Sequence, residues 1–293
     1  MGKAVKIVFL IIIVWFIIYS ILVKLGIVTP ENSNDEQTTE QSDEVGKDTK
    51  LTLEDELKQL NEADGENLEI IKFDDLKVGD IVEFGKYEQD ADRTNGKEPL
   101  EWIVLSVEDD RALLFSRYVI DGQIYNKGAD IFCWEDSKLR EWLNGSFYRI
   151  AFDQVEQNTI QRNIVKTPGN PMNGEQGSND TIDKIFVLTV QDMINPDYGF
   201  STDYEEMDDN RIGYATPRAS MELYNRDEAP KEKEAVSYWL RSSGDIVEIP
   251  ASVRHKSHNV SRASCVNKWG NLDSGALEVY PGGVRPALYI KLK

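Results

Sequence analysis

The residues best suited to nucleophilic or metal chemistry are few in this chain, which has two cysteines and two histidines among 293 residues. His255 and His258 are three positions apart, which would place both imidazoles on one face of a helix. The surrounding run, VRHKSHNVS, has the composition of strand and loop instead. A soft-metal site needs several converging ligands, and no third ligand accompanies this pair. We therefore expect no metal or other cofactor and, without a Ser–His–Asp or Cys–His arrangement, no nucleophilic enzyme.

Cys133 and Cys265 leave two alternatives open. Outside the cell the two thiols can pair as a disulfide. They can also remain two separate buried thiols, because an unpaired cysteine behaves as a small apolar side chain. The sequence favours the separate thiols only slightly.

Three arginines, Arg140, Arg241 and Arg285, lie inside otherwise apolar segments. A buried guanidinium must be paired, and most buried charges are structural. We expect these side chains to hold loops through carboxylates or backbone carbonyls. The carboxylates available to them are Glu101, Glu135 and Asp183. The functional alternative is a cation at the floor of a ligand pocket, which makes Arg241 and Arg285 candidate ligand-binding residues.

Aromatic side chains provide the other candidate ligand contacts. Trp269 lies in the polar run NKWGN, and loop aromatics can stack on ligands. Trp239 is a second candidate, although a tryptophan in an apolar run is more often part of a core. Core positions are expected for Trp102, Trp134 and Trp142. The acidic residues 203–209 could offer oxygen ligands to Ca²⁺ but lack the spacing of an EF-hand, so we interpret them as a solvated loop.

Short strands and helices must position these residues. Runs rich in β-branched and aromatic residues predict strands at 81–87, 100–107, 111–118 and 183–190, and in several pieces from 237 onward. Helical spacing and capping residues predict helices at 136–144, 153–160, 191–194 and 217–224. In the first helix, Asp136 is the expected N-cap and Asn144-Gly145 the expected end. Because strands and helices do not alternate regularly, the sequence predicts an α+β domain with short antiparallel strands, few short helices and long loops.

The net charge of −19 is distributed unevenly along the chain. Residues 1–28 contain three lysines and no acid, whereas residues 29–69 contain fourteen acids and three lysines. Nucleic-acid binding depends on Lys and Arg that neutralise phosphates, so we expect no nucleic-acid partner. The pattern predicts an anchor at 1–28, an acidic disordered linker at 29–66 with one short helix near Leu57, and a domain at 67–293.

An uncharged apolar run begins at Ile7 and ends at Val23. About 20 helical residues cross a hydrocarbon core of ~30 Å, and Lys24 can snorkel so that the span extends to Val28. A cleaved signal peptide is the alternative, but its apolar core has only about 7–15 residues and precedes a small-residue cleavage site. The sequence therefore predicts a single-pass signal-anchor in the cell membrane. The lysines before the span favour a cytoplasmic N-terminus and an extracytoplasmic C-terminal domain.

Several motifs, in order along the chain, resemble an uncharacterised Gram-positive family known as a domain of unknown function, number six-two-seven-three. The longest motif is WEDSKLREWLN at 134–144, followed by Phe147, Ala151 and Phe152. The other motifs are at 79–80, 84–87, 101–105 (EWIVL), 183–188 (DKIFVL), 238–242 (YWLRS) and 283–288 (GVRPAL). Together they cover about residues 73–291. The last two are also remotely similar to sulfatase-modifying, formylglycine-generating proteins.

The second resemblance implies a C-type-lectin-like fold, but a shared fold does not carry a function. Formylglycine-generating oxidases use a closely spaced cysteine pair, and Cys133 and Cys265 are far apart in this chain. We therefore expect a non-enzymatic recognition module that binds a cell-wall glycan or a surface protein through loops around Trp269 and residues 195–235. The alternatives are a divergent enzyme with a non-standard site and a structural protein of the cell envelope.

Overall fold

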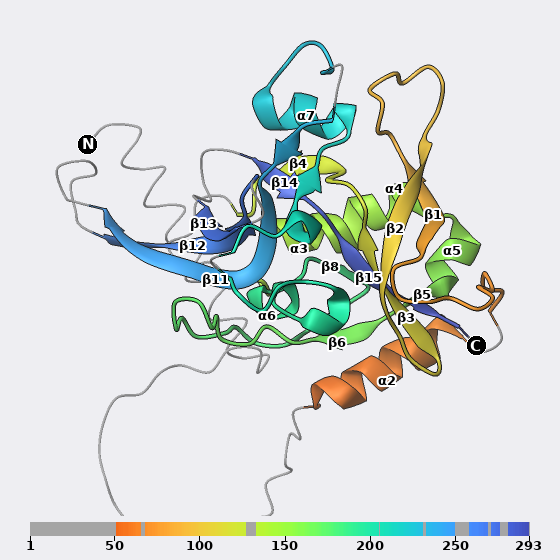
Figure 1. Cartoon of the computed structure of the whole chain (residues 1–293). Coiled ribbons are helices and arrows are strands. Elements are labelled where there is room, and N and C mark those ends of the chain that lie inside the picture. Colours follow the sequence, from red (N-terminus) through yellow and green to blue (C-terminus); the bar gives the residue numbers. More distant parts are fainter. Residues whose placement is uncertain are drawn as a thin grey trace, which may run out of the picture. The chain divides into compact units, whose positions relative to one another are not determined.

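Short strands and a few short helices form a mixed α+β fold, as the sequence predicts (Figure 1). The structure is a computed structural model that describes residues 51–65, 68–126, 133–204, 206–230, 233–249, 258–268, 271–275 and 281–292. The predicted anchor from Ile7 to Val23 and most of the predicted linker lie outside these residues. Within the described part of the chain, no helix is both long enough and apolar enough to span a membrane.

The first sheet has six antiparallel strands in the order β1-β2-β3-β15-β5, with β8 also paired to β15. Its strands are β1 (Ile81–Tyr87), β2 (Glu98–Val107), β3 (Arg111–Ser116), β5 (Ile160–Gln161), β8 (Ile185–Phe186) and β15 (Ala287–Lys291). The predicted hairpin between β2 and β3 is confirmed, and the Glu108 N–H donates to the Arg111 carbonyl across its turn at 2.8 Å. The central strand β3 is almost completely buried, as its apolar sequence requires.

The second sheet has five strands in the order β13-β12-β11-β14-β4. Its strands are β4 (Asp121–Gln123), β11 (Tyr238–Ile249), β12 (His258–Val266), β13 (Leu272–Gly275) and β14 (Gly282–Val284). Only the β11–β14 pairing among these is parallel. Two smaller sheets pair β6 (Asn163–Val165) with β7 (Thr181–Asp183) and β9 (Gly213–Tyr214) with β10 (Ala235–Val236).

The chain passes between the two large sheets at a joint where two connections run side by side. One connection leads from β3 to β4, and the other leads from β14 to β15 through Arg285 and Pro286. The Ser116 N–H donates to the Pro286 carbonyl at 2.8 Å, and the Ile120 N–H donates to the Val284 carbonyl at 2.9 Å. These bonds link the two connections, so the relative position of the sheets is fixed by backbone pairing.

Glycine is required where β14 approaches β11. A β-carbon on Gly283 would lie 2.6 Å from the Ser237 carbonyl oxygen, and one on Gly282 would overlap the Trp239 ring. The absence of side chains at both positions lets β14 lie against β11 at this distance.

The helices are short and most begin at capping residues. They are α3 (Lys138–Trp142), η1 (Leu143–Phe147), α4 (Tyr148–Ala151), α5 (Gln154–Thr159), α6 (Val190–Met193), η2 (Pro196–Tyr198), η3 (Asp209–Arg211) and α7 (Pro217–Tyr224). The helices predicted at 153–160, 191–194 and 217–224 are confirmed as α5, α6 and α7. Side chains of Asp153, Thr189 and Thr216 accept the capping hydrogen bonds.

The prediction for residues 136–144 is wrong at both ends. The N-cap is Ser137, whose hydroxyl accepts from the Arg140 N–H at 3.1 Å. Asn144 and Gly145 do not end the helix, which continues through the π-helix η1 into α4. The reason is that the Asn144 amide is bonded to a distant segment: its oxygen accepts from the Lys184 N–H at 2.8 Å and its nitrogen donates to the Ile185 carbonyl at 2.8 Å.

The end of the predicted linker is ordered. Residues Leu53–Asp64 form helix α2, capped by Thr52, which confirms the short helix expected near Leu57. α2 contacts β6 and β7, and it lies beside β6 in Figure 1. The Asp64 carboxylate accepts from Arg162 at 2.8 Å. The described unit therefore includes residues that the sequence assigned to the linker.

The motifs at 134–144 and 183–188 meet around one buried carboxylate. Asp183, whose side chain is 1% exposed, forms an ion pair with Arg140 at 2.6 Å. It also accepts from the Trp134 indole at 2.9 Å and from the Thr181 hydroxyl at 2.6 Å. Arg140 therefore has the structural role expected for it, with Asp183 as the partner.

Replacing Asp183 with alanine should strongly destabilise the domain. The Asp183→Ala variant leaves the Arg140 guanidinium without its carboxylate and the Trp134 indole without its acceptor, and removing one partner of a buried ion pair costs about 3–5 kcal/mol. We expect the free energy of unfolding, measured by denaturant titration, to fall by that amount. The exposed Asp227→Ala is the control and should change it by less than about 0.5 kcal/mol. Equal stability of the two variants would contradict the assignment.

Candidate functional site

A pocket of about 400 Å³ lies between the first sheet and the loop that follows α6. We call it the Arg285 pocket. Its walls are formed by Val78, Gly79, Ile103, Val104, Leu105, Phe115, residues 196–200, Asn210 and Arg285. Apolar and aromatic side chains predominate, with a small number of polar groups among them. This size and composition are typical of sites that bind a small molecule or one unit of a larger ligand.

The helical turn η2 positions the aromatic wall of the pocket. Its N-cap, Asn195, accepts from the Asp197 N–H at 3.0 Å, and the left-handed Gly199 ends the turn at φ 84°. The Asn210 amide donates to the Gly199 carbonyl at 2.9 Å, which holds the loop against η3. Tyr198 is consequently half-buried at the pocket, and burial raises the pKa of its hydroxyl to about 12, so the hydroxyl stays protonated.

Arg285 places a buried cation in the pocket wall. Its side chain is 3% exposed and its guanidinium carbon lies 4.1 Å from the centroid of the Phe115 ring. Its Nε donates to the Ser116 carbonyl at 2.8 Å, whereas its terminal nitrogens make only contacts of 3.4–3.5 Å, longer than ordinary hydrogen bonds. Burial lowers the pKa of Arg285, but an arginine remains charged at neutral pH.

No carboxylate of the described residues lies within ion-pair distance of Arg285. The cation is balanced instead by carbonyl oxygens, by the Tyr238 hydroxyl and by the faces of two aromatic rings. An acceptor or an anionic group on a ligand would therefore meet a positive charge with which no described carboxylate pairs, although the exposed Asp197 also lines the pocket. The arrangement can bind a molecule with an apolar or ring-shaped body and a polar end.

Of the candidate ligand-binding residues that the structure describes, Arg285 lines the pocket, whereas Trp239 and Arg241 do not. Trp239 is 3% exposed, donates to the Gln123 carbonyl at 2.8 Å and packs edge-on against Tyr125, so it belongs to the core. Arg241 donates to the Lys166 carbonyl at 3.1 Å and to the Val187 carbonyl, and it pairs with Asp192 at 3.3 Å. Both residues have the structural roles that the sequence favoured. Trp269 lies outside the described residues.

The remaining sequence-based predictions concern partners, thiols and imidazoles. Glu101 pairs with Arg117 rather than with the three arginines, and Glu135 bonds Arg140 through its carbonyl only. Cys133 and Cys265 are both free thiols. Burial raises the pKa of Cys133, and it raises the pKa of Cys265 to about 12, so both thiols are protonated at neutral pH. His255 lies outside the described residues, and His258 is the first residue of β12.

Two groups of side chains in the described part of the chain could each hold a cation. The first contains Cys133, Glu135 and Asp136. The second contains Glu88 and Asp90, in the loop after β1, and Glu98, the first residue of β2. Burial, Glu98 and Asp90 raise the pKa of Glu88, and its Oε1 is buried without a hydrogen-bond partner among the described atoms. Three carboxylates that each supply one oxygen give fewer than the six to eight oxygen ligands of Ca²⁺, so backbone or water oxygens would have to complete such a site.

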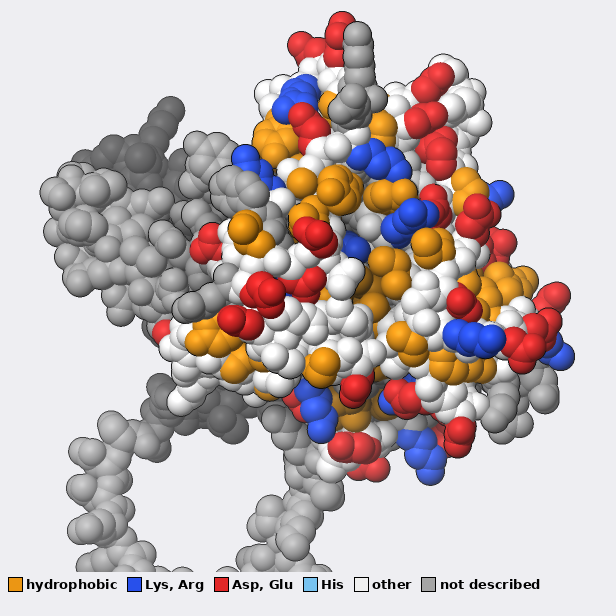
Figure 2. Space-filling model, in the orientation of Figure 1, with side chains coloured by type: hydrophobic (Ala, Val, Ile, Leu, Met, Phe, Trp, Pro, Cys, Tyr) orange, Lys and Arg blue, Asp and Glu red, His pale blue; other side chains and the backbone are white. Residues whose placement is uncertain are grey.

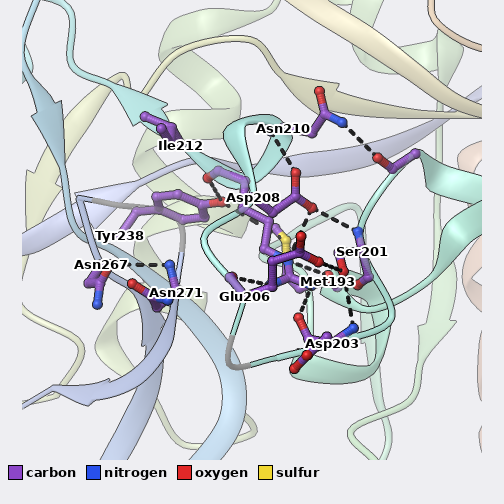
Figure 3. Close-up of polar contacts among 12 residues, drawn as sticks. Met193, Ser201, Asp203, Glu206, Asp208, Asn210, Ile212, Tyr238, Asn267 and Asn271 are labelled. Atoms are coloured by element: carbon purple, nitrogen blue, oxygen red, sulfur yellow. Dashed lines mark hydrogen bonds and ion pairs between the residues drawn. The ribbon is translucent and has the colours of Figure 1, made fainter.

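Of the residues 203–209, which the sequence analysis interpreted as a solvated loop, Asp203, Glu206 and Asp208 contact the buried Arg211 instead. Figure 3 shows these three acidic residues close to Ser201 and Met193. Arg211 is fully buried and donates to the Met193 carbonyl at 2.9 Å, to the Asp203 carbonyl at 2.9 Å and to the Ser201 carbonyl. Asp208 forms an ion pair with it at 3.5 Å. Arg211 is not among the residues predicted from the sequence. The available signal was a single arginine two positions after Asp209, where the acidic run ends.

Replacing Arg211 with lysine should loosen the acidic loop. A lysine ammonium keeps the charge but cannot donate to several carbonyls in the fixed fork of a guanidinium. We expect Arg211→Lys to lower the free energy of unfolding by about 2–4 kcal/mol, because buried carbonyls lose their donors. Hydrogen exchange of residues 201–209 should rise, while the exposed Arg226→Lys should leave it unchanged. Unchanged exchange in Arg211→Lys would show that the loop does not depend on the guanidinium.

Comparison with known proteins gave one match. The domain of unknown function DUF6273 matches residues 109–292. The matched segment contains the 134–144 motif, Asp183, Arg211 and Arg285, and it begins within the turn between β2 and β3 rather than at the earlier motifs near residue 79. No curated protein and no solved structure matched the chain. Since the match spans more than half of the 293 residues, the chain belongs to the DUF6273 family of domains of unknown function.

Proposed function

We propose that this chain is a single-pass membrane protein whose extracytoplasmic domain recognises a cell-envelope ligand in the Arg285 pocket without catalysing a reaction. The observation that carries the proposal is the pocket itself, which combines aromatic walls with a buried cation with which no carboxylate of the described residues pairs. The apolar run from Ile7 to Val23 and the lysines before it support the location.

The ligand that suits the pocket is a glycan unit or a short peptide segment. A sugar ring or an apolar side chain can pack against Tyr198 and Phe200, because aromatic faces at a pocket wall bind such groups. A carboxylate or carbonyl on the same ligand can accept from Arg285, and the exposed Asn210 amide offers a further polar contact. Protonated thiols in this chain give no support to a thiolate nucleophile.

A C-type-lectin-like fold is part of the proposal. The motifs YWLRS at 238–242 and GVRPAL at 283–288, which suggest this relationship, form the start of β11 and the β14–β15 connection. Two large sheets of mostly antiparallel strands, few helices and long loops are compatible with a C-type-lectin-like fold. A Gram-positive source, suggested by the family motifs, would place the domain in the cell wall, where glycans and peptides of the envelope are the available ligands.

The Tyr198→Ala variant tests the pocket. Truncating an aromatic side chain at a binding site costs about 1–2 kcal/mol, so affinity for the ligand should fall about 5- to 30-fold. The purified full-length chain in a non-ionic detergent would be applied to an array of cell-wall glycans and peptides, with and without Ca²⁺, and the dissociation constant of any bound component measured for both proteins. Tyr224→Ala, an exposed tyrosine on α7, is the matched control and should bind like the unmodified chain.

Two outcomes would contradict the proposal. Binding that is equally strong in Tyr198→Ala would place the ligand elsewhere. The absence of any bound component, together with chemical turnover of an added substrate, would favour the divergent enzyme over the recognition module.

The location is tested separately with a C-terminal tag on the full-length chain. Protease added to intact cells should remove the tag, because the lysines before the apolar run favour a cytoplasmic N-terminus. A tag that resists protease until the cells are lysed would show that the C-terminal domain lies in the cytoplasm and would contradict the proposed topology. A cytoplasmic protein expressed in the same cells is the control for membrane integrity.

A further inference from the structure

A second pocket, of about 350 Å³, collects basic side chains. We call it the basic pocket and define it by Arg162, Lys184 and Lys291, which come from the β5–β6, β7–β8 and β15 segments. The polar groups around them are Asn61, Asp64, Tyr148, Gln154, Gln157 and Asn158. The whole chain has a net charge of −19, so the three basic side chains that line this pocket differ from the acidic character of the rest of the protein. Figure 2 shows acidic and basic side chains interspersed over one face of the domain, without a continuous basic area.

The charges in the basic pocket are not balanced. Asp64 pairs with Arg162 at 2.8 Å and lies 3.9 Å from Lys184, and among the described residues no acid pairs with Lys291. Burial lowers the pKa of Lys184, the nearby Arg162 and Lys291 lower it further, and Asp64 opposes these effects. One carboxylate therefore offsets three positive charges that repel one another. Additional negative charge would relieve this repulsion.

The neutral groups of the pocket hold the lysine in place. The Lys184 ammonium donates to the Tyr148 hydroxyl at 2.7 Å and lies 4.8 Å from the centroid of the Tyr148 ring. The Tyr148 hydroxyl donates in turn to the Gln157 carbonyl at 3.2 Å. Arg162 and Lys184 are each less than one-fifth exposed, so the cations are positioned within the pocket before any ligand arrives.

Asp64 joins the end of α2 to the domain through charge. It is the last residue of α2, a helix whose leucines Leu53, Leu57 and Leu60 are only half-buried and which has no fully buried residue. A negative charge at a helix C-terminus is disfavoured by the helix dipole, so this position does not stabilise α2 itself. Its favourable contacts are with the basic pocket, where it occupies the place that an external anion would take.

We propose that the basic pocket binds a tetrahedral oxyanion, the phosphate or sulfate group of a ligand, and that this anion displaces Asp64 and releases α2 from the domain. A dianion carries twice the charge of the carboxylate and can accept hydrogen bonds from the three basic side chains at once. Because the pocket binds the anion only when Asp64 has left, Asp64 weakens the apparent affinity for the ligand. The site is distinct from the Arg285 pocket, and neither proposal depends on the other.

The test uses the full-length chain in a non-ionic detergent and inorganic phosphate as the probe, titrated at constant ionic strength and followed by ³¹P NMR. We expect Asp64→Asn to bind phosphate about tenfold more tightly than the unmodified chain, because the competing carboxylate is absent. Glu62→Gln removes the same charge from α2 but does not line the basic pocket, so it should bind like the unmodified chain. Adding Lys184→Gln to Asp64→Asn should abolish binding. Circular dichroism would confirm that each variant is folded.

Two further measurements separate the parts of the proposal. Hydrogen exchange of residues 53–64 in the unmodified chain should increase when phosphate binds, and sulfate should act like phosphate whereas acetate should be much weaker. Equal phosphate affinity in the unmodified chain, Asp64→Asn and Glu62→Gln would overturn the proposal, as would binding that survives Lys184→Gln. Phosphate binding without faster exchange in α2 would refute the displacement of the helix.

Discussion

One buried guanidinium lies at the joint between the two sheets and adds its contacts to the backbone bonds that link them. Arg285 lies in the two-residue connection between β14 and β15, so it belongs to neither sheet and contacts both. Its Nε bonds the carbonyl at the end of β3, and its planar group lies over Phe115 of the first sheet and near Tyr238 of the second. A guanidinium can do this because it offers five donors in one plane and also packs on aromatic rings. The same residue forms part of the pocket wall, so the joint and the candidate site are one feature.

Buried arginines recur because the fold is rich in loops and short strands. Such segments leave carbonyl oxygens that no helix or sheet pairs, and a buried carbonyl without a donor costs free energy. Arg211 satisfies carbonyls of the acidic loop, and Arg241 satisfies those of Lys166 and Val187. Each guanidinium thus replaces several backbone bonds that regular secondary structure would otherwise supply. Acidic loops are consequently compatible with an ordered domain here, since the cation they surround offsets their charge.

Local patterns in the sequence predicted the local structure. The bounds of the strand at 81–87 and of the helix at 217–224 agree with those observed, because β-branched and aromatic composition and a capping residue are properties of neighbouring residues alone. The continuation of the helix past Asn144 could not be predicted, because the Asn144 amide is bonded to Lys184 and Ile185, about forty positions away. Arg241 and Arg285 look alike in the sequence, and only the position of η2 decides that Arg285 lines the pocket.

The acidic linker ends in helix α2, whose last residue, Asp64, forms an ion pair with Arg162 of the domain. The sheets are held by fully buried apolar side chains, whereas α2 has only half-buried leucines and an ion pair at Asp64. Attraction between partly exposed charges is screened by salt over about 10 Å at 0.1 M, but apolar packing is not weakened in this way. On the proposal for the basic pocket, anions therefore weaken the attachment of α2 more than they weaken the sheets. α2 is also the described element that is nearest in sequence to the apolar N-terminal run.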